Sequence, residues 1–581
     1  MESLLLSYNS FGGPLLLPSR HMRNLLELDI SNNNLEGFIP YETARSFPSL
    51  EFLNLSTNNF EGNIPSSLGY MTTLSVLDLS NNRLSGEIPV HLAKGCHLLN
   101  FLRLSNNFLK GPVLPHQNNL NQLEYLYSDN NGFIEIPPDL SQSPLIVLNV
   151  SANQLVGKIP AFMGNMPLMV LYMADNHLEG PIPIEFCQLI DLRLLDLSEN
   201  NITGAVPSCF NSSPIKSIRL SKNRLHGPFP TAFQDLPLLE LDLSYNQFSG
   251  TIPTWIGSLS ELTVLLLQNN HFEGNIPKKL CHLSSLTLID LSSNNLTGRI
   301  PHCISKLEFK GIPTPTVYDT NNLYFSQPTF TISLRDLRMV LKSEQSQNLN
   351  FISPAVEEVE FQTKGMSLSY KGTVLYLFSG INLSHNRLTG PIPPEMGNLS
   401  QIKVLNFSHN YLTGTIPVAF SNLKSVESLD LSYNHLNGKI PSQLTELYFL
   451  AVFNLSYNNL SGRTPQRVAQ FATFEWSSYI GNPLLCGEPL PRKCNAAYSP
   501  PSTPRAAVND TEEDSGFMDM DVFYMSFAGS YVTVVLAILA ILFINPYWRK
   551  AWFHLLEVLL TSSFYFVVDN LVRPVRGFLR V

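Results

Sequence analysis

Seven cysteines are the residues whose spacing first suggests chemistry. Cys187 and Cys209 lie 22 residues apart, and Cys281 and Cys303 have the same separation. The first member of each pair follows a proline by four residues and the second follows the next such proline by two, so both pairs occupy equivalent places on adjacent turns of a repeat. This phase match predicts two disulfides and an oxidising compartment, with buried free thiols as the alternative. Cys96 has no partner in the pattern, and zinc is disfavoured because no C-x-x-C or close histidine pair occurs.

Motifs that would support catalysis are absent from the sequence. Neither a G-x-G-x-x-G loop nor the V-A-I-K, H-R-D and D-F-G motifs of a protein kinase occur. Charged residues make up 14% of the chain, the net charge is -9 and no long basic tract exists, so nucleic acid is not an expected partner. His385 and His409 do not constitute a metal site on this evidence. We therefore expect no enzyme activity, no cofactor and no metal.

The elements that position these residues come from a repeat, L-x-x-L-x-L-x-x-N-x-L-x-G-x-I-P. One copy runs from Leu74 through Leu79, Asn82 and Gly86 to Pro89, and the copies are spaced by 22 to 25 residues. Such self-similarity predicts a solenoid of stacked coils. The repeat asparagine marks seventeen copies, at Asn9, Asn33, Asn58, Asn82, Asn107, Asn131, Asn153, Asn176, Asn200, Asn223, Asn246, Asn270, Asn294, Asn386, Asn410, Asn434 and Asn458.

Each part of the repeat has a physical interpretation. The alternating L-x-L predicts a short strand whose leucines face one side, and equivalent strands of successive copies would pair into a parallel inner sheet. The asparagine amide is expected to bond to the backbone that turns away from the strand. The glycine and proline are expected to belong to an irregular outer segment. No copy buries its leucines alone, so stability must come from stacking.

The L-x-G-x-I-P ending resembles the plant-specific class of extracellular leucine-rich repeats. An insert, residues 302–372, separates thirteen copies from the last four, and this order is similar to plant leucine-rich-repeat receptor-like proteins. The resemblance implies a repeat superhelix of α/β type with a parallel inner sheet, an interrupting island domain and one transmembrane helix. It also implies that Cys486 and Cys494 close a C-terminal cap. Family members often carry a tyrosine nine positions before a Lys-Gly pair, but here Ala355 precedes Lys364 and Gly365, so island contacts are not carried over.

Five residues that depart from the usual Asp or Asn in the strands are candidates for ligand contact. Tyrosine and arginine are frequent anchors of interfaces, and side chains between the strand leucines should face outward from the inner sheet. The alternative is that these are solvent-exposed positions that accept many residue types and have no role in binding. The hypothetical ligand-binding residues are Arg103, Tyr125, Tyr127, Tyr172 and Arg219.

The last four copies place His385, His409, Tyr433 and Tyr457 just before the repeat asparagine. One register implies one column on the inward side of the solenoid. By resemblance, a co-receptor kinase docks near this region. The alternative is that S-H-N and S-Y-N are part of the repeat consensus.

Glycosylation sequons agree with an extracytoplasmic location, although many arise because N-L-S is built into the repeat. Strand-embedded sites such as Asn382 would either stay unmodified or carry a glycan that blocks the inner face. The sequon asparagines are Asn54, Asn149, Asn201, Asn211, Asn295, Asn382, Asn398, Asn406, Asn454, Asn459 and Asn509.

The C-terminal region carries a membrane signal. Residues 522–544 contain no charge over 23 residues, enough to cross a bilayer as a helix. Acidic residues precede this segment and Arg549 and Lys550 follow it, which places the C-terminus in the cytosol. The N-terminus, in contrast, has no basic or long apolar stretch typical of a secretory signal, and the array begins inside a repeat at Leu4. The chain therefore resembles the C-terminal part of a longer receptor.

These patterns predict a single-pass plasma-membrane receptor that binds an extracellular protein, peptide or glycan signal. The resemblance implies signalling through an adaptor receptor-like kinase and a co-receptor kinase in the same membrane, most commonly in immunity. The alternatives are a developmental peptide receptor, a wall-associated inhibitor of microbial enzymes, and a truncated non-functional or decoy product. The expected domains are repeats (1–301, the first truncated), the island (302–372), four repeats (373–465), the cysteine cap (466–498), an acidic linker (499–521), the transmembrane helix (522–544) and a cytoplasmic tail (545–581).

Overall fold

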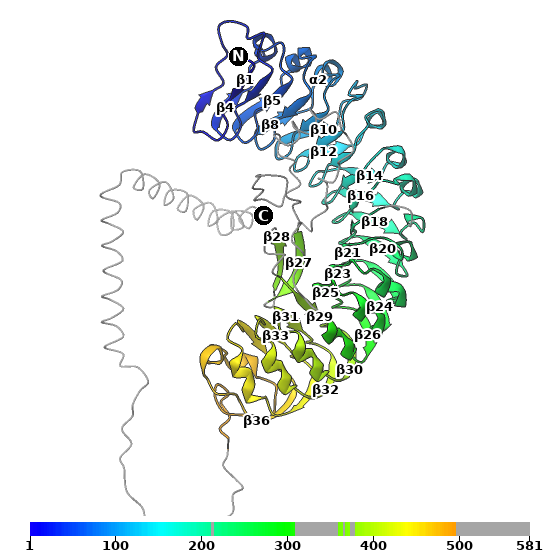
Figure 1. Cartoon of the computed structure of the whole chain (residues 1–581), viewed down its shortest axis with the longest axis vertical. Coiled ribbons are helices and arrows are strands. Elements are labelled where there is room, and N and C mark those ends of the chain that lie inside the picture. The colour runs from blue at the N-terminus through cyan, green and yellow to red at the C-terminus, as the bar shows by residue number, and fades with distance from the viewer. Residues whose placement is uncertain (211–213, 308–357, 364–365, 372–377, 495–581) are drawn as a thin grey trace, which may run out of the picture. The chain divides into compact units, whose positions relative to one another are not determined.

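The computed structural model describes residues 1–210, 214–307, 358–363, 366–371 and 378–494. They belong to one compact unit, Met1–Asn495, whose coils stack along a curved path (Figure 1). The predicted membrane segment and tail lie outside the described residues. Within the described part of the chain, no helix is both long and apolar enough to span a bilayer.

A parallel sheet of 17 strands lines the concave side, one strand per repeat, as the L-x-L pattern predicts. The pairing continues across the insert, because Leu288 pairs with Gly380 although some ninety residues separate them. The strands are β1 (Ser3–Leu5), β3 (Glu27–Asp29), β5 (Phe52–Asn54), β7 (Val76–Asp78), β9 (Phe101–Arg103), β11 (Tyr125–Tyr127), β13 (Val147–Asn149), β15 (Val170–Tyr172), β17 (Leu194–Asp196), β19 (Ser217–Arg219), β21 (Glu240–Asp242), β23 (Val264–Leu266), β25 (Leu288–Asp290), β29 (Gly380–Asn382), β31 (Val404–Asn406), β33 (Ser428–Asp430) and β35 (Val452–Asn454).

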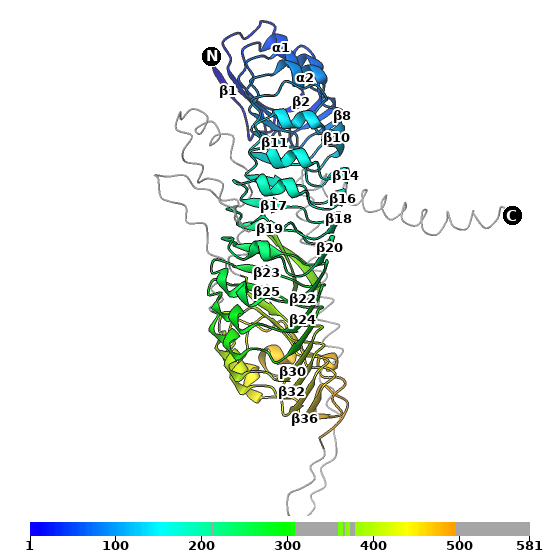
Figure 2. The same ribbon diagram turned by 90° about the vertical axis from the view of Figure 1, so that its right-hand side faces the viewer.

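The L-x-G-x segment is a second short strand and not an irregular stretch, which corrects the expectation from sequence. Figure 2 shows these strands along one flank of the solenoid. Six of them pair as β2 (Gly12–Pro14), β4 (Asn34–Phe38), β6 (Asn59–Asn63), β8 (Arg83–Gly86), β10 (Phe108–Pro112) and β12 (Gly132–Glu135). Twelve pair as β14 (Val156–Lys158), β16 (His177–Gly180), β18 (Asn201–Gly204), β20 (Arg224–Gly227), β22 (Gln247–Thr251), β24 (His271–Asn275), β26 (Asn295–Gly298), β30 (Arg387–Pro391), β32 (Tyr411–Thr415), β34 (His435–Gly438), β36 (Asn459–Arg463) and β37 (Leu484–Cys486).

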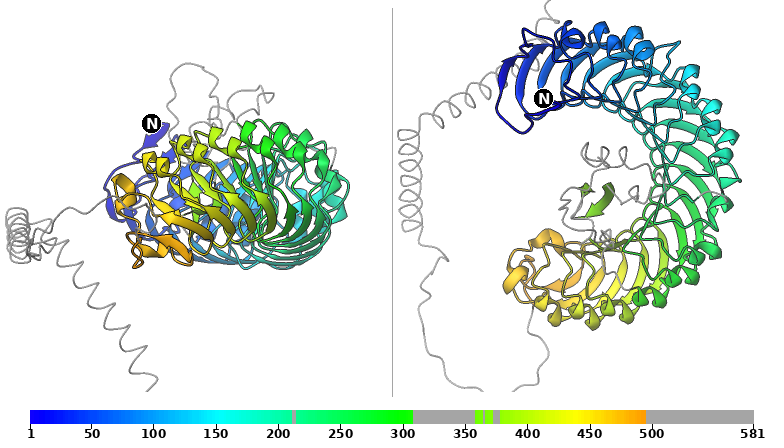
Figure 3. Two further views of the ribbon diagram at one scale, coloured as in Figure 1. Left: turned by 90° about the horizontal axis from the view of Figure 1, so that it is seen from below. Right: turned by 45° about the horizontal axis from the view of Figure 1, so that its top comes forward.

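Short helices cover the convex side, which Figure 3 shows as the outer rim. Most begin directly after the repeat proline, whose fixed φ suits the residue before a helical turn. The α-helices are α1 (Thr43–Ser46) and α2 (Val90–Gly95). The 3-10 helices are η1 (Ser66–Tyr70), η2 (Pro138–Gln142), η3 (Ala161–Asn165), η4 (Ile184–Gln188), η6 (Thr231–Phe233), η7 (Thr254–Ser258), η8 (Lys278–His282), η9 (His302–Lys306), η12 (Pro394–Asn398), η13 (Val418–Asn422), η14 (Ser442–Glu446), η15 (Ala469–Ala472) and η16 (Trp476–Ser478).

The repeat asparagines join each coil to the coil before it. Asn82 Nδ2 donates to the carbonyl of Leu79 in its own coil at 3.1 Å and to that of Leu55 in the preceding coil at 3.0 Å. Its Oδ1 accepts the Phe60 N–H, also from the preceding coil, at 3.0 Å. Asn482 makes the same bonds, accepting from Leu460 and donating to Leu455. The asparagine ladder therefore includes a member that the repeat pattern did not reveal.

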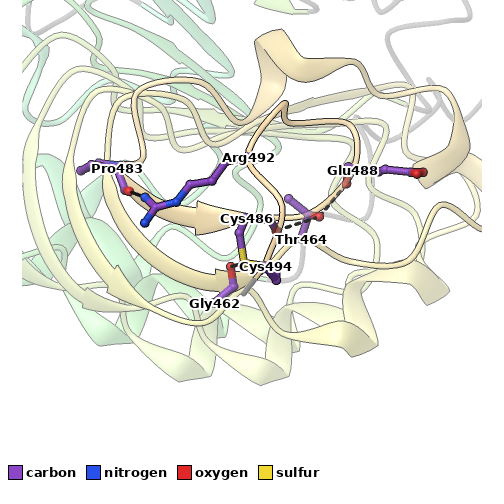
Figure 4. The surroundings of a disulfide bond; sticks show 7 residues. All are labelled: Gly462, Thr464, Pro483, Cys486, Glu488, Arg492 and Cys494. Atoms are coloured by element: carbon purple, nitrogen blue, oxygen red, sulfur yellow. Dashed lines mark hydrogen bonds between the residues drawn. A yellow bond between two sulfur atoms is a disulfide. The ribbon is translucent and has the colours of Figure 1, made fainter. Parts of the chain in front are cut away.

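Three disulfides hold the pairs expected from the sequence, Cys187–Cys209, Cys281–Cys303 and Cys486–Cys494. Figure 4 shows the last of these at the cap, where Thr464 Oγ1 donates to the carbonyl of Glu488 at 2.5 Å and Arg492 donates to the carbonyl of Pro483. Cys96 is a buried free thiol whose Sγ lies 3.3 Å from the carbonyl oxygen of Leu68. Burial raises the pKa of this thiol to about 12, so at neutral pH it is protonated and a poor nucleophile.

Candidate ligand-binding surface

The three candidate tyrosines are packed on the concave sheet and are not exposed. Tyr125, Tyr127 and Tyr172 are 3, 8 and 7% exposed, within a cluster of apolar residues from β7 to β17. The Phe101 ring lies 5.6 Å from that of Tyr127 and 6.2 Å from that of Tyr125. Strands ~4.8 Å apart let large side chains of one row cover each other. These side chains lie on the concave sheet outside the main core, but neighbouring side chains bury them. Their contact with a ligand stays a hypothesis.

Arg103 belongs to the same patch and is half-buried. Its guanidinium carbon lies 5.8 Å from the centre of the Tyr127 ring, within the range of a cation–π contact. Of the five candidate residues, Arg103 keeps the largest accessible part.

Arg219 is buried and bonded to two carboxylates of the protein itself. Its Nε and Nη2 donate to the two carboxylate oxygens of Glu240, each at 3.0 Å, and its Nη1 lies 3.6 Å from Asp196 Oδ2. Burial acts to lower the pKa of Arg219, but the charges of Glu240 and Asp196 outweigh it and hold that pKa well above its ordinary value. Because Glu240 and Asp196 already bind the guanidinium, Arg219 has few hydrogen-bond donors left for a ligand.

The end of the insert is a β-hairpin packed on the concave sheet. Strands β27 (Glu358–Thr363) and β28 (Met366–Lys371) are antiparallel and lie inside the curve of the solenoid (Figures 1 and 3). Val359 and Phe361 pack with inner-sheet residues of β23, β25 and β31. Lys222 forms ion pairs with Glu360 and Glu199, each at 2.8 Å. The hairpin is therefore attached by an apolar contact and by a bridging cation.

Gly380 makes room for this attachment. A Cβ atom at Gly380 would lie 2.9 Å from two ring atoms of Phe361, closer than atoms can approach. Neighbouring strands carry Leu288 and Val404 at the paired positions. The glycine thus creates a depression in the sheet, and the Phe361 ring fills it. Lys364, Gly365 and Ala355 lie outside the described residues.

The last four repeats present a continuous stack of aromatic rings. The ring centres of His385 and His409 are 4.1 Å apart, those of His409 and Tyr433 4.1 Å, and those of Tyr433 and Tyr457 4.3 Å. Tyr433 and Tyr457 are 42 and 44% exposed. The column predicted from the register is therefore present, and it forms an accessible surface. We call these four residues the ring column.

The ring column stands on an unusual backbone conformation. All four residues have φ between 51 and 53°, the left-handed region that disfavours ordinary side chains. The other repeats have the same conformation at this position with varied residues, among them Asn32, Asn81, Thr57, Lys222 and Tyr245. The conformation therefore belongs to the repeat, and the stacking of the rings is what sets the ring column apart.

The two histidines of the ring column are disposed to stay neutral. Burial lowers the pKa of His385, against the attraction of Asp430. Burial also lowers the pKa of His409, and the neighbouring His385 lowers it further. A neutral imidazole both donates and accepts hydrogen bonds.

A pocket of about 190 Å³ opens between the ring column and the hairpin. It is lined by residues of the inner sheet, by His385, His409 and Tyr433 of the ring column and by Thr363 of β27. Asn406, Asp430 and Asn454 from successive strands supply polar groups to the floor. Sequence reasoning missed this pocket because Thr363 is distant in sequence from the other lining residues.

Family models of leucine-rich repeats match this chain. One matches residues 190–248, 213–272 and 379–436, and a second matches 24–45, 49–71, 73–94, 167–189 and 285–307. The chain is 55% identical over 260 residues to Cuscuta receptor 1 of Solanum lycopersicum, a match over 45% of this chain and 23% of that protein. It is 55% identical over 212 residues to Receptor like protein 21 of Arabidopsis thaliana, over 36% of this chain and 21% of that protein. The chain therefore contains leucine-rich repeats and is similar in sequence to plant receptor-like proteins.

The matched part amounts to less than a quarter of each of these receptor-like proteins. Among solved structures, the Arabidopsis receptor kinase HAESA in complex with the peptide hormone IDA and the co-receptor SERK1 is similar, with a TM-score of 0.51 and 28% identity. The similarity covers 85% of this chain and 88% of that one. The two sequence relatives are named as a receptor and a receptor-like protein, in agreement with the expectation that the chain is not an enzyme.

The sequons of this chain differ in accessibility, and this gives a testable prediction. Asn201, Asn398 and Asn459 are exposed, whereas Asn382 is fully buried and Asn54 nearly so. Because the Asn54 side chain is buried, its amide nitrogen has no space to carry a glycan in the folded protein. After secretion from a eukaryotic cell, peptide mass spectrometry should find glycans at the three exposed sites and none at the two buried ones. A glycan on Asn382 in correctly folded protein would contradict this prediction. Asn211 and Asn509 lie outside the described residues.

Proposed function

We propose that this chain is the ligand-binding part of a cell-surface receptor that binds an extracellular signal through its concave face and signals through partner kinases, in defence. The observation that supports this most is the ring column, an accessible stack of aromatic rings in the last four repeats. A peptide or protein signal fits better than a glycan, because the structurally similar HAESA ectodomain binds a peptide hormone beside SERK1. A developmental peptide receptor is the second candidate on the same observation.

The expected role of the ring column is contact with a co-receptor kinase. We predict that replacing all four of its residues with asparagine leaves the fold intact. The lost stacking, ~0.5–1.5 kcal/mol per pair, is offset by relief of a backbone cost of ~1–2 kcal/mol per residue. Association with full-length SERK1, used as the probe, should fall at least about tenfold. The measurement is co-precipitation from plant cells treated with apoplastic fluid, together with the melting temperature of the purified variant.

A matched control is Tyr245→Asn. Tyr245 has φ 52° and lies in the same register, but outside the last four repeats. It should leave the association unchanged. Retained association of the fourfold variant would contradict the co-receptor role, and so would a wild-type chain that never associates with SERK1.

Delivery to the cell surface is tested separately. A glycosidase mobility shift on the tagged full chain in plant cells should show that the repeats reach the secretory lumen. Without a shift, the truncated or decoy interpretation would gain support. Inhibition of microbial wall-degrading enzymes by the purified chain would favour the wall-associated inhibitor instead.

A further inference from the structure

The pocket between the ring column and the hairpin has a size that suits one side chain. Its volume of about 190 Å³ equals that of about six waters at ~30 Å³ each. Pockets that enclose a whole small ligand are larger, ~300–1,000 Å³. The pocket therefore fits a single long side chain presented by a larger ligand.

One carboxylate lies in the polar lining of the pocket. Asp430 lies in the floor, and its Oδ1 accepts the Ser432 N–H at 2.9 Å and the Ser432 hydroxyl at 2.7 Å. Its Oδ2 accepts only a long bond, 3.5 Å, from Asn454 Nδ2 among the described residues. A carboxylate has about four lone-pair sites, so Oδ2 retains acceptor capacity toward the pocket.

The charge of the pocket is negative. Asp430 is the sole carboxylate among the described lining residues, and no lysine or arginine is among them. The nearby Lys403 is paired with Glu427 at 3.1 Å, so this pair adds no net charge. The histidines His385 and His409, disposed to be neutral, add acceptor nitrogens to one wall.

We propose that this pocket binds the cationic end of a lysine or arginine side chain of a peptide or protein ligand, with Asp430 as its counter-charge. The assignment deepens the proposed receptor function and rests on it for the nature of the ligand. The aliphatic stem of the side chain would lie along Val404, Val452 and the ring edges, and the nitrogen donors would meet Asp430.

Other occupants fit less well. An anion would meet the Asp430 carboxylate without any compensating lysine or arginine in the lining. A metal ion lacks ligands, since the described residues contain no group of three or more His, Cys, Asp or Glu placed to hold one. A neutral group rich in hydroxyls is the remaining alternative occupant. Comparing the affinities of charged and uncharged probes distinguishes it from a cationic side chain.

The test uses Asp430→Asn on the full purified chain. Asn406 and Asn454 occupy the same register in the neighbouring strands, and their Oδ1 atoms accept the Ser408 and Ser456 N–H groups at 3.0 and 3.1 Å. The substitution therefore keeps the turn through Oδ1, removes the charge and replaces the Oδ2 acceptor with an NH2 donor. The probes are N-acetyl-arginine amide, N-acetyl-lysine amide and the uncharged N-acetyl-citrulline amide, followed by ligand-observed NMR.

We expect the wild-type chain to bind at least one cationic probe about tenfold more tightly than the citrulline probe, the order expected for a charge-assisted hydrogen bond. Asp430→Asn should remove this difference. The relative affinities of the arginine and lysine probes then identify the preferred side chain.

The control is Asp29→Asn in β3, far from the pocket. Asp29 Oδ1 accepts the Ser31 N–H at 3.0 Å and the Ser31 hydroxyl at 2.7 Å, like Asp430 in its own turn. Both substitutions create an N-x-S sequon, so only protein whose positions 29 and 430 carry no glycan by mass spectrometry is used for binding. Equal binding of the charged and uncharged probes, or equal effects of the two substitutions, would overturn the assignment. Because the probes bind without SERK1 or signalling, failure here is distinct from failure of the proposed receptor function.

Discussion

Replacing Gly380 with valine is expected to release the hairpin from the concave sheet. The Cβ alone would lie 2.9 Å from the Phe361 ring, and the two methyl groups of valine would extend further into its volume. Phe361 is completely buried, and burial of such a side chain stabilises by ~1.5–3 kcal/mol. Since valine occurs at the paired position 404 of β31, the strand itself tolerates the substitution. Hydrogen exchange should therefore accelerate in β27 and β28 and stay slow in β29.

A double-mutant cycle tests the cause. Phe361→Ala should destabilise the hairpin by ~3–5 kcal/mol, as for other buried phenylalanines. If a clash with Phe361 is the reason for the effect of Gly380→Val, the double variant should be no less stable than Phe361→Ala alone. If the losses of stability from Gly380→Val and Phe361→Ala add strictly, the glycine is not there to make room for Phe361.

Replacing Arg219 with alanine is expected to destabilise the middle of the solenoid by ~3–5 kcal/mol, because it leaves buried carboxylates without their counter-charge. The Glu240 side chain is 2% exposed and the Asp196 side chain 9%. Hydrogen exchange in β17, β19 and β21 is the appropriate measurement, since a repeat protein unfolds in parts and a single unfolding free energy is not defined for it.

Lys222→Ala is the matched control. Lys222 also bridges two carboxylates, but its side chain is 38% exposed. Exposed ion pairs contribute ~0–1 kcal/mol, so the effect on β19 should be small. A loss below about 1 kcal/mol on removal of Arg219 would show that its ion cluster is dispensable, and would restore Arg219 as a candidate for ligand contact.

The repeat made most of the solenoid predictable. Leucine periodicity gave the inner strands, and the phase of Cys187 and Cys281 gave their disulfide partners. The second strand was missed because its glycine, such as Gly86 with φ 79°, interrupts the alternation by which strands are recognised. Asn482 was missed because the cap lacks the leucine pattern that precedes the other repeat asparagines.

The site was less predictable, because burial depends on contacts between distant residues. The residue type alone does not tell which arginine is accessible to a ligand. Arg219 is bonded to Glu240, whereas Arg103 stays partly accessible. The hairpin had a signal that was not used, the alternation of Val359, Phe361 and Thr363 with polar residues. Gly380 was a second signal, since a lone glycine in a strand indicates a close approach. The ring column was predictable because a fixed register in identical coils places its members together.

The direction of the asparagine ladder has a consequence for how the protein is made. Asn82 bonds backward to Leu55 and Phe60, and Asn482 bonds backward to Leu455 and Leu460. Every turn is thus completed by the coil that follows it. A chain emerging from the ribosome grows from N- to C-terminus, so its newest coil always lacks the asparagine that finishes its turn. The turn of the last repeat is completed only after Asn482 has left the ribosome, because this asparagine bonds to Leu455 and Leu460.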